Sequence, residues 1–265
     1  MTKTVLTIAG SDTLAGGGLQ SDLKTFENHH LFGLTAITCI AVIKDHQFEI
    51  NDLSPSLLQD QLMSIKQEVT LSGIKLGLIH DIASLLIVKK FLADFIGPIV
   101  IDPVMAFKES DQIYSKAYRN GLIELFPLAT IITPNLKEAE LLSQQVITNL
   151  DQMKQAAQIM IDLGAPAVVI KGGERLAGDL ASDLFYDGNT YQIFSKPKLA
   201  KTTINGAGCT FASAITSNLV LGKDLPTAIA NSKDFVYQSI QRGIILNSGE
   251  GNVWYGKDVE TEEKT

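Results

Sequence analysis

The sequence has 265 residues, of which 45% are hydrophobic and 19% are charged. A chain of this length and composition can bury a sizeable core, which excludes disorder over most of its length. The formal net charge of −7 comes without a block of basic residues, which argues against nucleic acid or an anionic membrane as the main partner. A small anionic cofactor is not excluded, because backbone amides and a few lysines can hold it locally.

The cysteines and the N-terminus indicate the cellular compartment in which the protein is expected to function. Cys39 and Cys209 form neither a metal-binding spacing nor a disulfide framework, so we expect two free thiols in a reducing environment. The apolar run in MTKTVLTIAGSD ends after about six residues, which is too short for a signal-peptide core or a membrane span. We therefore expect a cytoplasmic protein without a membrane partner.

Apolar segments rich in β-branched residues alternate with segments of helical periodicity. The predicted strands, in chain order, are VLTIAG, LTAITCIAVI, SGIKLGLI, PIVIDPVM, ATIITP and APAVVIKGG. Between them, apolar residues recur at helical spacing, first at Leu19, Leu23 and Phe26. This alternation is typical of parallel strands joined by helical crossovers, and so predicts an α/β fold.

The last third of the chain adds a hairpin and more helices. FYDGNTYQIF has Asp-Gly-Asn between two apolar stretches, which predicts an antiparallel hairpin at an edge of the sheet. Helical spacing returns at Phe211, Ile215 and Leu219. No internal repeat, Pro/Gly-rich linker or change of composition divides the sequence, so we expect residues 1–265 to form one domain.

Ligands of open α/β sheets bind beyond the carboxyl ends of the strands, so these positions hold the candidate sites. In AGSDTLAGGGLQSDLKTF, consecutive glycines precede a predicted helix. They would let the backbone approach a ligand next to free N–H groups, although a flexible turn explains the same pattern. Asp22, one turn into the helix, is either a solvated acid favoured by the helix dipole or a residue that faces a ligand.

Two further strand ends carry acidic residues. Asp102 in VIDPVM ends a strand before Pro103, where it is either a cap or loop acceptor or a ligand of metal-bound water. Asn135 and Glu138 in TPNLKEAELL lie three residues apart at a predicted helix start, and a capping arrangement explains them without any function. The alternative is that they orient Mg²⁺ and its waters at a phosphate, since Mg²⁺ prefers oxygen ligands.

Lys171 ends a predicted buried strand and is followed by Gly172 and Gly173 in VVIKGGE. An ammonium in such a place is poorly solvated unless an anion accompanies it, so a phosphate is a natural partner. Extension of the side chain to solvent is the alternative.

In NGAGCTFAS, Gly206, Ala207 and Gly208 would turn the chain so that successive N–H groups face one concavity at a helix start. Such a turn binds an oxyanion. The helix end is also expected to lower the pKa of Cys209 and so give a thiolate at neutral pH. This thiolate would take a proton from a hydroxyl or attack a carbonyl, whereas an inert packed cysteine is the alternative. Cys39 lies within an apolar strand and is expected to be inert.

The segments AGSD, GLQSDLKTF, IDPVM, TPNLKEAE, VIKGG and GAGCT occur in this order between residues 9 and 210. Together they resemble the ribokinase superfamily, and within it the branch of the hydroxymethylpyrimidine (phosphate) kinases and the related pyridoxal kinases. The resemblance implies a ribokinase-like three-layer α/β/α sandwich with a central, mostly parallel sheet and an antiparallel edge hairpin. It also implies ATP and Mg²⁺ as cofactors, a planar ring alcohol as substrate, and a homodimer.

The resemblance also implies roles for single residues. Cys209 stands where most of the superfamily has an aspartate base, which makes it the expected catalytic residue, and its anion hole would be Gly206, Ala207 and Gly208. Asp102 and Glu138 would serve Mg²⁺. The phosphates of ATP would be bound by Lys171, Gly172, Asn135 and Glu138. The substrate ring would lie among Gly10, Asp22, Ile43, Leu78, Val104 and Asn205.

The identity of the ring depends on one position. Pyrimidine kinases of this branch usually have a glutamine where ITCIAVIKD has Ile43. An isoleucine cannot pair with a polar pyrimidine edge, which favours a pyridoxal-type substrate, as does the run GAGCTFASA. For an aldehyde substrate, Cys209 has a second possible role in forming a hemithioacetal. A hydroxymethylpyrimidine (phosphate) kinase and a non-catalytic binder of pyridoxal phosphate are the alternatives, and the joint presence of Cys209, Lys171, Glu138 and Asp102 argues against the second.

Two positions depart from the family pattern. Asn205 replaces a histidine that commonly precedes the glycine turn, and an asparagine carries neither proton nor charge at neutral pH, so rate or substrate preference is expected to differ. Leu78 replaces a methionine and keeps the pocket wall apolar. We expect the adenine contacts to come from the segment 186–203 and from the last helices.

Overall fold

A nine-stranded sheet forms the middle layer of the structure, a computed structural model that describes residues 2–45, 47–105 and 115–256. The order of its strands is β3-β2-β1-β4-β5-β6-β7-β8-β9. Their bounds are β1 Thr4–Asp12, β2 Phe32–Lys44, β3 Gln47–Asp52, β4 Gly73–Leu76, β5 Ile99–Ile101, β6 Ile131–Ile132, β7 Val168–Lys171, β8 Leu180–Tyr186 and β9 Tyr191–Pro197.

The central strands are parallel and both edges are antiparallel. Strands β2, β1, β4, β5, β6 and β7 run in one direction, whereas β3 at one edge and β8 and β9 at the other are antiparallel to their neighbours. The predicted α/β fold with a mostly parallel sheet and an edge hairpin is therefore confirmed. The sequence analysis missed β3, because its residues are mostly exposed and its alternating pattern is short.

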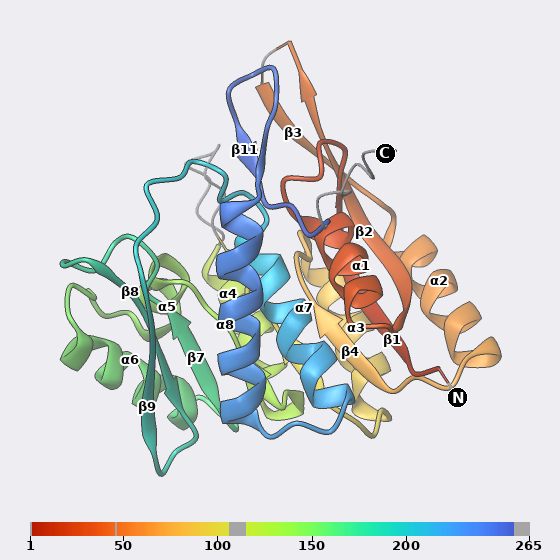
Figure 1. The fold of residues 1–265 in the computed structure, drawn as a ribbon. Coiled ribbons are helices and arrows are strands. Elements are labelled where there is room, and N and C mark those ends of the chain that lie inside the picture. The colour runs from red at the N-terminus through yellow and green to blue at the C-terminus, as the bar shows by residue number, and fades with distance from the viewer. Residues whose placement is uncertain (1, 46, 106–114, 257–265) are drawn as a thin grey trace.

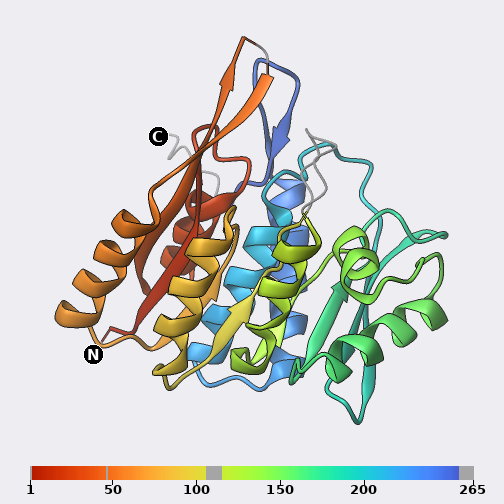
Figure 2. The same ribbon diagram turned by 180° about the vertical axis from the view of Figure 1, so that it is seen from behind.

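Helices cover both faces of the sheet, which gives the expected three layers. Helices α1, α7 and α8 lie on one face, and α2, α3, α4, α5 and α6 lie on the other (Figures 1 and 2). Their bounds are α1 Gly18–Asn28, α2 Pro55–Glu68, α3 Ile82–Ala93, α4 Lys116–Ile123, α5 Leu136–Ser143, α6 Leu150–Asp162, α7 Ala207–Val220 and α8 Leu225–Gln241. None of the described helices has a stretch that is long and apolar enough to cross a membrane.

The helices begin in two different ways. Helices α2, α3, α6 and α8 begin after Ser54, Asp81, Asn149 and Asp224, and each of these side chains accepts the N–H of the residue three positions on. Such caps satisfy amides that a helix start would otherwise leave open. Helix α7 begins after Gly206 without a side-chain cap. The Ala207 amide, predicted to be part of the anion hole, donates instead to the Ile204 carbonyl at 3.1 Å, which leaves the amides of Gly208 and Cys209 for another acceptor.

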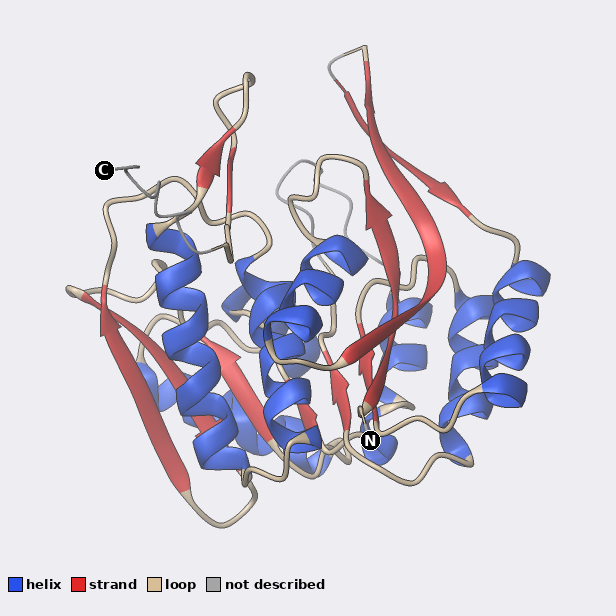
Figure 3. Cartoon of the chain, turned by 45° about the vertical axis from the view of Figure 1, so that its right-hand side comes forward, coloured by secondary structure: helices blue, strands red, loops and turns tan. Residues whose placement is uncertain are grey.

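Two hairpins project beyond the sheet at the end where the parallel strands have their carboxyl ends (Figure 3). One is formed by β2 and β3, and the other by β10 (Ile244–Ile245) and β11 (Gly251–Asn252). The loops that carry the candidate site residues gather at this same end, as expected for an open α/β sheet.

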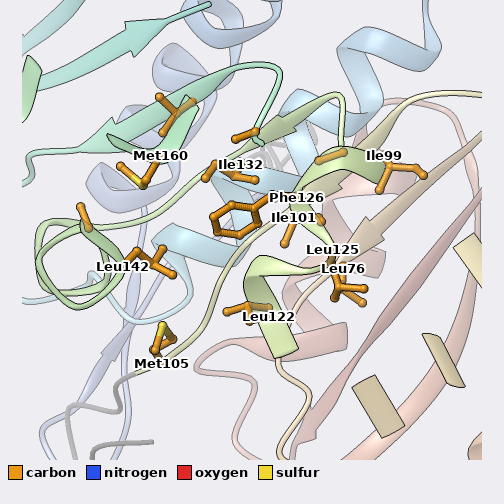
Figure 4. Packing of buried hydrophobic residues seen from close by; sticks show 14 of the residues in the cluster. Leu76, Ile99, Ile101, Met105, Leu122, Leu125, Phe126, Ile132, Leu142 and Met160 are labelled. Carbon is orange, nitrogen blue, oxygen red and sulfur yellow. The ribbon is translucent and has the colours of Figure 1, made fainter. Parts of the chain in front are cut away.

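The larger hydrophobic cluster fills the space between the sheet and α2 to α6, and part of it is shown in Figure 4. Phe126 lies in its middle, among side chains of the sheet and of the neighbouring helices, and is fully buried. Replacing Phe126 by Ala should lower the free energy of unfolding by about 3–5 kcal/mol, because it leaves a cavity in a packed core. Urea denaturation measures this change.

The matched control is Ile96→Ala, because Ile96 is 96% exposed and should change the free energy of unfolding by less than about 0.5 kcal/mol. Equal effects of the two substitutions would contradict the packing described here.

Candidate active site

The turn before α7 presents open amides at a helix start. Gly206 has φ of +85°, and a Cβ placed on it would lie 2.8 Å from Oγ of Ser21, so both conformation and space require glycine. The N–H of Thr210 donates a hydrogen bond to the Gly206 carbonyl at 2.9 Å. Between these residues, the amides of Gly208 and Cys209 belong to the first turn of a 14-residue helix, where they can bind an oxyanion.

Cys209 is a partly exposed residue whose thiol lies against the glycine loop. A Cβ placed on Gly17 would lie 3.8 Å from Sγ, and the Gly18 amide acts to lower the pKa of the thiol. Burial raises the pKa of Cys209 to about 11, although the positive charge of Lys75 acts in the opposite direction. The predicted thiolate at neutral pH is therefore wrong for the free protein, because desolvation outweighs the helix end.

The glycine loop approaches its own chain as well as Cys209. Gly18 has φ of +59°, and a Cβ placed on it would lie 2.3 Å from the Gly10 carbonyl oxygen. A Cβ placed on Gly10 would in turn lie 2.7 Å from Sγ of Cys39 and 3.4 Å from Leu78. Gly10 and Leu78, both predicted to contact the substrate, are thus neighbours. Burial raises the pKa of the Cys39 thiol to about 11, which agrees with its expected inertness.

Residues near the C-terminal end fix both the loop and the turn. The Asn252 side chain donates to the Leu14 carbonyl at 2.8 Å. The Asn205 amide donates to the Gly251 carbonyl at 3.0 Å, and the Val253 amide donates to the Asn205 carbonyl at 3.0 Å. The Asn205 side chain donates to Glu250 Oε2 at 2.9 Å, so in this structure the residue that replaces the usual histidine is engaged with the C-terminal segment.

Asp22 is 0% exposed, and both of its oxygens accept hydrogen bonds. Oδ1 accepts from Ser213 Oγ at 2.5 Å, and Oδ2 accepts from Thr7 Oγ1 at 2.6 Å and from Lys75 Nζ at 2.9 Å. This burial contradicts the solvated-acid alternative and argues against the predicted direct contact with a ring. The sequence analysis overlooked Lys75, although a lysine inside the predicted buried strand SGIKLGLI was the sign that an internal partner had to exist.

Lys171 lies between a carboxylate and the α7 turn. Its Nζ is 2.7 Å from Asp102 Oδ1, which also accepts a hydrogen bond from Thr133 Oγ1 at 3.1 Å. A Cβ placed on Gly208 would lie 3.3 Å from the same Nζ. The ammonium therefore has the anionic partner that its burial requires, and its predicted alternative, extension to solvent, is wrong.

Asn135 and Glu138 form a capping box at the start of α5. Glu138 Oε2 accepts the Asn135 amide at 2.7 Å, and Asn135 Oδ1 accepts the Glu138 amide at 3.0 Å. Burial raises the pKa of Glu138 to about 7, while the charge of Lys171 lowers it and that of Asp102 raises it. The capping interpretation is confirmed, and it places the Glu138 carboxylate close to Asp102 and Lys171.

The described residues contain no group of three or more His, Cys, Asp or Glu side chains that could hold a metal ion. Mg²⁺ does not require such a group, since it keeps several waters and commonly takes one or two carboxylates together with substrate phosphates. Asp102 and Glu138 supply two neighbouring carboxylates. The donor set therefore fits Mg²⁺ that arrives with a nucleotide.

A cavity of about 790 Å³ opens on the other side of the turn, and its volume suits a nucleotide. It extends from Lys171 and Gly208 to the edge strand β9 and to α8. Its walls include residues of both segments that were expected to contact adenine, namely Lys196, Pro197, Lys198, Leu199, Val236, Tyr237 and Ile240. The sequence analysis did not identify Asp183 and Lys233, which also line the cavity and pair at 2.7 Å.

The structure does not bring every predicted residue to the turn. Gly172 follows Lys171 along the cavity wall, and its amide donates to Asp183 Oδ1 at 3.1 Å. Val104 is partly buried, two residues beyond Asp102. Ile43 is 54% exposed on the projecting hairpin, where it pairs with Phe48, and its contact with a ring stays a prediction.

Alkylation of Cys209 tests the raised pKa. Its reaction with iodoacetamide should accelerate about tenfold per pH unit from about pH 7 to about pH 9, because only the thiolate reacts. Mass spectrometry of the peptide that contains Cys209 measures the rate, and fully buried Cys39 is the internal control that should stay unmodified. A plateau near neutral pH would instead support a thiolate.

Residues 12–254 match the family model described as phosphomethylpyrimidine kinase. The pyridoxine kinase of Bacillus subtilis is 34% identical over 93% of this chain and 93% of its own length. The hydroxymethylpyrimidine/phosphomethylpyrimidine kinase of Haemophilus influenzae is 35% identical over 95% of this chain and 97% of its own length.

The solved structures that resemble this one include kinases of the same two kinds. Pyridoxal kinase from Staphylococcus aureus, in complex with AMP-PCP and pyridoxal, has a TM-score of 0.91 and 34% identity, and the match covers 99% of this chain and 96% of that one. Phosphomethylpyrimidine kinase from Clostridium difficile has a TM-score of 0.78 and 32% identity, over 90% of this chain and 100% of that one. These matches confirm the resemblance found in the sequence, and the chain belongs to the phosphomethylpyrimidine kinase family, in the branch that includes the pyridoxal kinases.

Proposed function

We propose that the chain uses ATP and Mg²⁺ to phosphorylate the 5-hydroxymethyl group of pyridoxal, and also that of pyridoxine and pyridoxamine. The observation that carries this proposal is the position of the α7 turn between two features. The Cys209 thiol, which lies against Gly17 of the glycine loop, is on one side, and the 790 Å³ cavity reaches Gly208 and Lys171 on the other. A phosphoryl group held at the turn would lie between a nucleotide and a ring alcohol.

Phosphoryl transfer depends mainly on positioning and on stabilisation of charge. In the proposed complex, ATP occupies the cavity and its terminal phosphate meets the amides of Gly208 and Cys209, which stabilise charge as it develops. Lys171 binds the phosphates from the opposite side. Mg²⁺, held by Asp102 and through Glu138, would neutralise phosphate charge.

The acceptor hydroxyl also has to be oriented and to lose its proton, and we assign this role to Cys209. A loose transition state needs little activation of the hydroxyl before transfer. The Cys209 sulfur therefore orients the hydroxyl and, in its thiolate form, takes the proton as the phosphorus–oxygen bond forms. Because burial raises the pKa of this thiol to about 11, the reactive form is a small fraction of the free protein at neutral pH.

We propose that residues 1–265 act as one kinase domain, an inference supported by the single sheet that joins strands from Thr4 to Pro197. The homodimer and the cytoplasmic location stay predictions.

Replacing Cys209 by Ala should lower kcat by more than tenfold and leave the affinity for ATP nearly unchanged, because the nucleotide cavity does not include this side chain. Steady-state kinetics and ATP titration measure the two quantities. Cys39→Ala is the control and should keep turnover within tenfold of the unmodified protein. A Cys209→Ala variant that also stays within tenfold would refute the catalytic role.

The second candidate function is phosphorylation of hydroxymethylpyrimidine, since the Haemophilus influenzae relative that bears this name is as similar in sequence as the pyridoxine kinase. A competition in one tube, with equal concentrations of pyridoxal, pyridoxine and hydroxymethylpyrimidine, compares the kcat/KM values directly. We expect pyridoxal phosphate to dominate in mass spectrometry of the products. A dominant pyrimidine phosphate would favour the second function, and no product would favour a non-catalytic binder.

Ile43→Gln tests the position on which the choice of ring depends. The introduced amide should shift the product ratio toward the pyrimidine by about tenfold, the value of one well-placed hydrogen bond. Ile40→Gln is the matched control on the same strand, since Ile40 is also exposed. An equal shift in both variants, or none in either, would show that Ile43 does not set the preference.

A further inference from the structure

A pair of opposite charges lies entirely inside the protein behind the α7 turn. Lys75 on β4 and Asp22 on α1 are both 0% exposed, and Nζ and Oδ2 are 2.9 Å apart. A buried pair of this kind seldom stabilises a fold more than apolar residues of similar volume would, because both charges lose their hydration. Stability alone is therefore a weak reason for placing a lysine in the middle of a core strand.

The pair is connected to the helix that carries Cys209. Ser213 lies one helical turn after Cys209 on α7, so the two side chains share a face of the helix. Its hydroxyl donates to Asp22 Oδ1 at 2.5 Å, and Thr7 donates to Oδ2 at 2.6 Å. These bonds fix the carboxylate, and the carboxylate fixes the ammonium.

Lys75 keeps its charge in this setting. Burial is the largest single effect and would lower the pKa of Lys75, but Asp22, Cys209 and Asp102 together more than offset it and the pKa is raised. The charged and titratable groups that act on Cys209 come from several elements: Lys75 from β4, Asp22 from α1, Asp102 after β5, Lys171 from β7 and Tyr255 from the C-terminal segment. Among the interactions that favour the thiolate, that of Lys75 is the largest, while Asp22 and Asp102 oppose it.

We propose that Lys75 is a positioning residue whose ammonium, held in place by Asp22, supplies the positive charge that allows the Cys209 thiol to ionise. Lys75 neither lines the 790 Å³ cavity nor reaches solvent, so any effect on the reaction has to pass through neighbouring side chains. The inference deepens the proposed function, because it concerns the proton on the residue to which that function assigns the acceptor hydroxyl. It also holds for the free protein, without any substrate.

The test is the pH dependence of iodoacetamide alkylation at Cys209 in the full chain, without ligands. Lys75→Met should slow alkylation at about pH 8 by about tenfold, equivalent to a rise of about one unit in the pKa of Cys209. The double variant Asp22→Asn with Lys75→Met should change the rate in the same direction but less, because it also removes the opposing carboxylate charge. The double variant leaves no unpaired buried charge, so it decides the question if the single variant does not fold.

Two controls separate this role from a structural one. Ser213→Ala removes a hydrogen bond of the same network and keeps both charges. Lys66→Met removes a lysine whose ion pair with Asp94, at 3.1 Å, is exposed. Both should keep the alkylation rate within about twofold of the unmodified protein, because both keep the buried charges of Lys75 and Asp22.

If folded Lys75 variants show an unchanged alkylation profile, the proposal is overturned and the pair only anchors α1 to β4. In an active kinase, the variants should lower kcat at neutral pH and leave KM for ATP unchanged. A shifted alkylation profile in a protein without kinase activity would support the role of Lys75 and refute the proposed function, so the two can fail separately.

Discussion

The ion pair between Lys171 and Asp102 holds together the segments from which the site is built. Lys171 is the last residue of β7, and Asp102 follows β5. The Lys171 ammonium contacts Asp102 and also lies against Gly208 at the start of α7. The sheet thereby places a positive charge next to open helix amides, at one end of the cavity. Because both partners are largely buried, the loss of either would leave the other as a poorly solvated charge.

The site is organised as two buried pairs on two sides of one helix start. Lys171, paired with Asp102, faces the 790 Å³ cavity, and Lys75, paired with Asp22, lies on the other side of the helix start. Each cation is neutralised in the free protein, which allows it to remain in the interior. An incoming phosphate has to compete with Asp102 for Lys171, whereas nothing enters to compete for Lys75. The pair of Lys171 and Asp102 can therefore rearrange when a ligand binds, while the electrostatic field of Lys75 and Asp22 stays the same.

The sequence was sufficient for the fold and for the grouping of the candidate residues at one end of the sheet, but not for the electrostatics of the candidate site. The strands around Asp102 and Lys171 and the turn at Gly206 were predictable, because β-branched runs, prolines and glycines act locally. The pKa of Cys209 was not, because the effect of a helix end depends on how much water reaches the sulfur, and burial is decided by the glycine loop about 190 residues earlier in the chain. Asp183 and Lys233 were missed for a similar reason, since a cavity wall made by β8 and α8 has no motif of its own.

The hydrogen bonds from residues 250–253 to the glycine loop and to Asn205 affect the order in which the site forms during synthesis. Leu14 in the glycine loop and Asn205 before the α7 turn are both held by residues between Glu250 and Val253. Domains begin to fold from the N-terminal side while the chain is still being made. The sheet can form early, but the environment of the thiol is completed only when the last strand has left the ribosome. A nascent or C-terminally clipped chain would carry the core of the enzyme with an unfinished catalytic pocket.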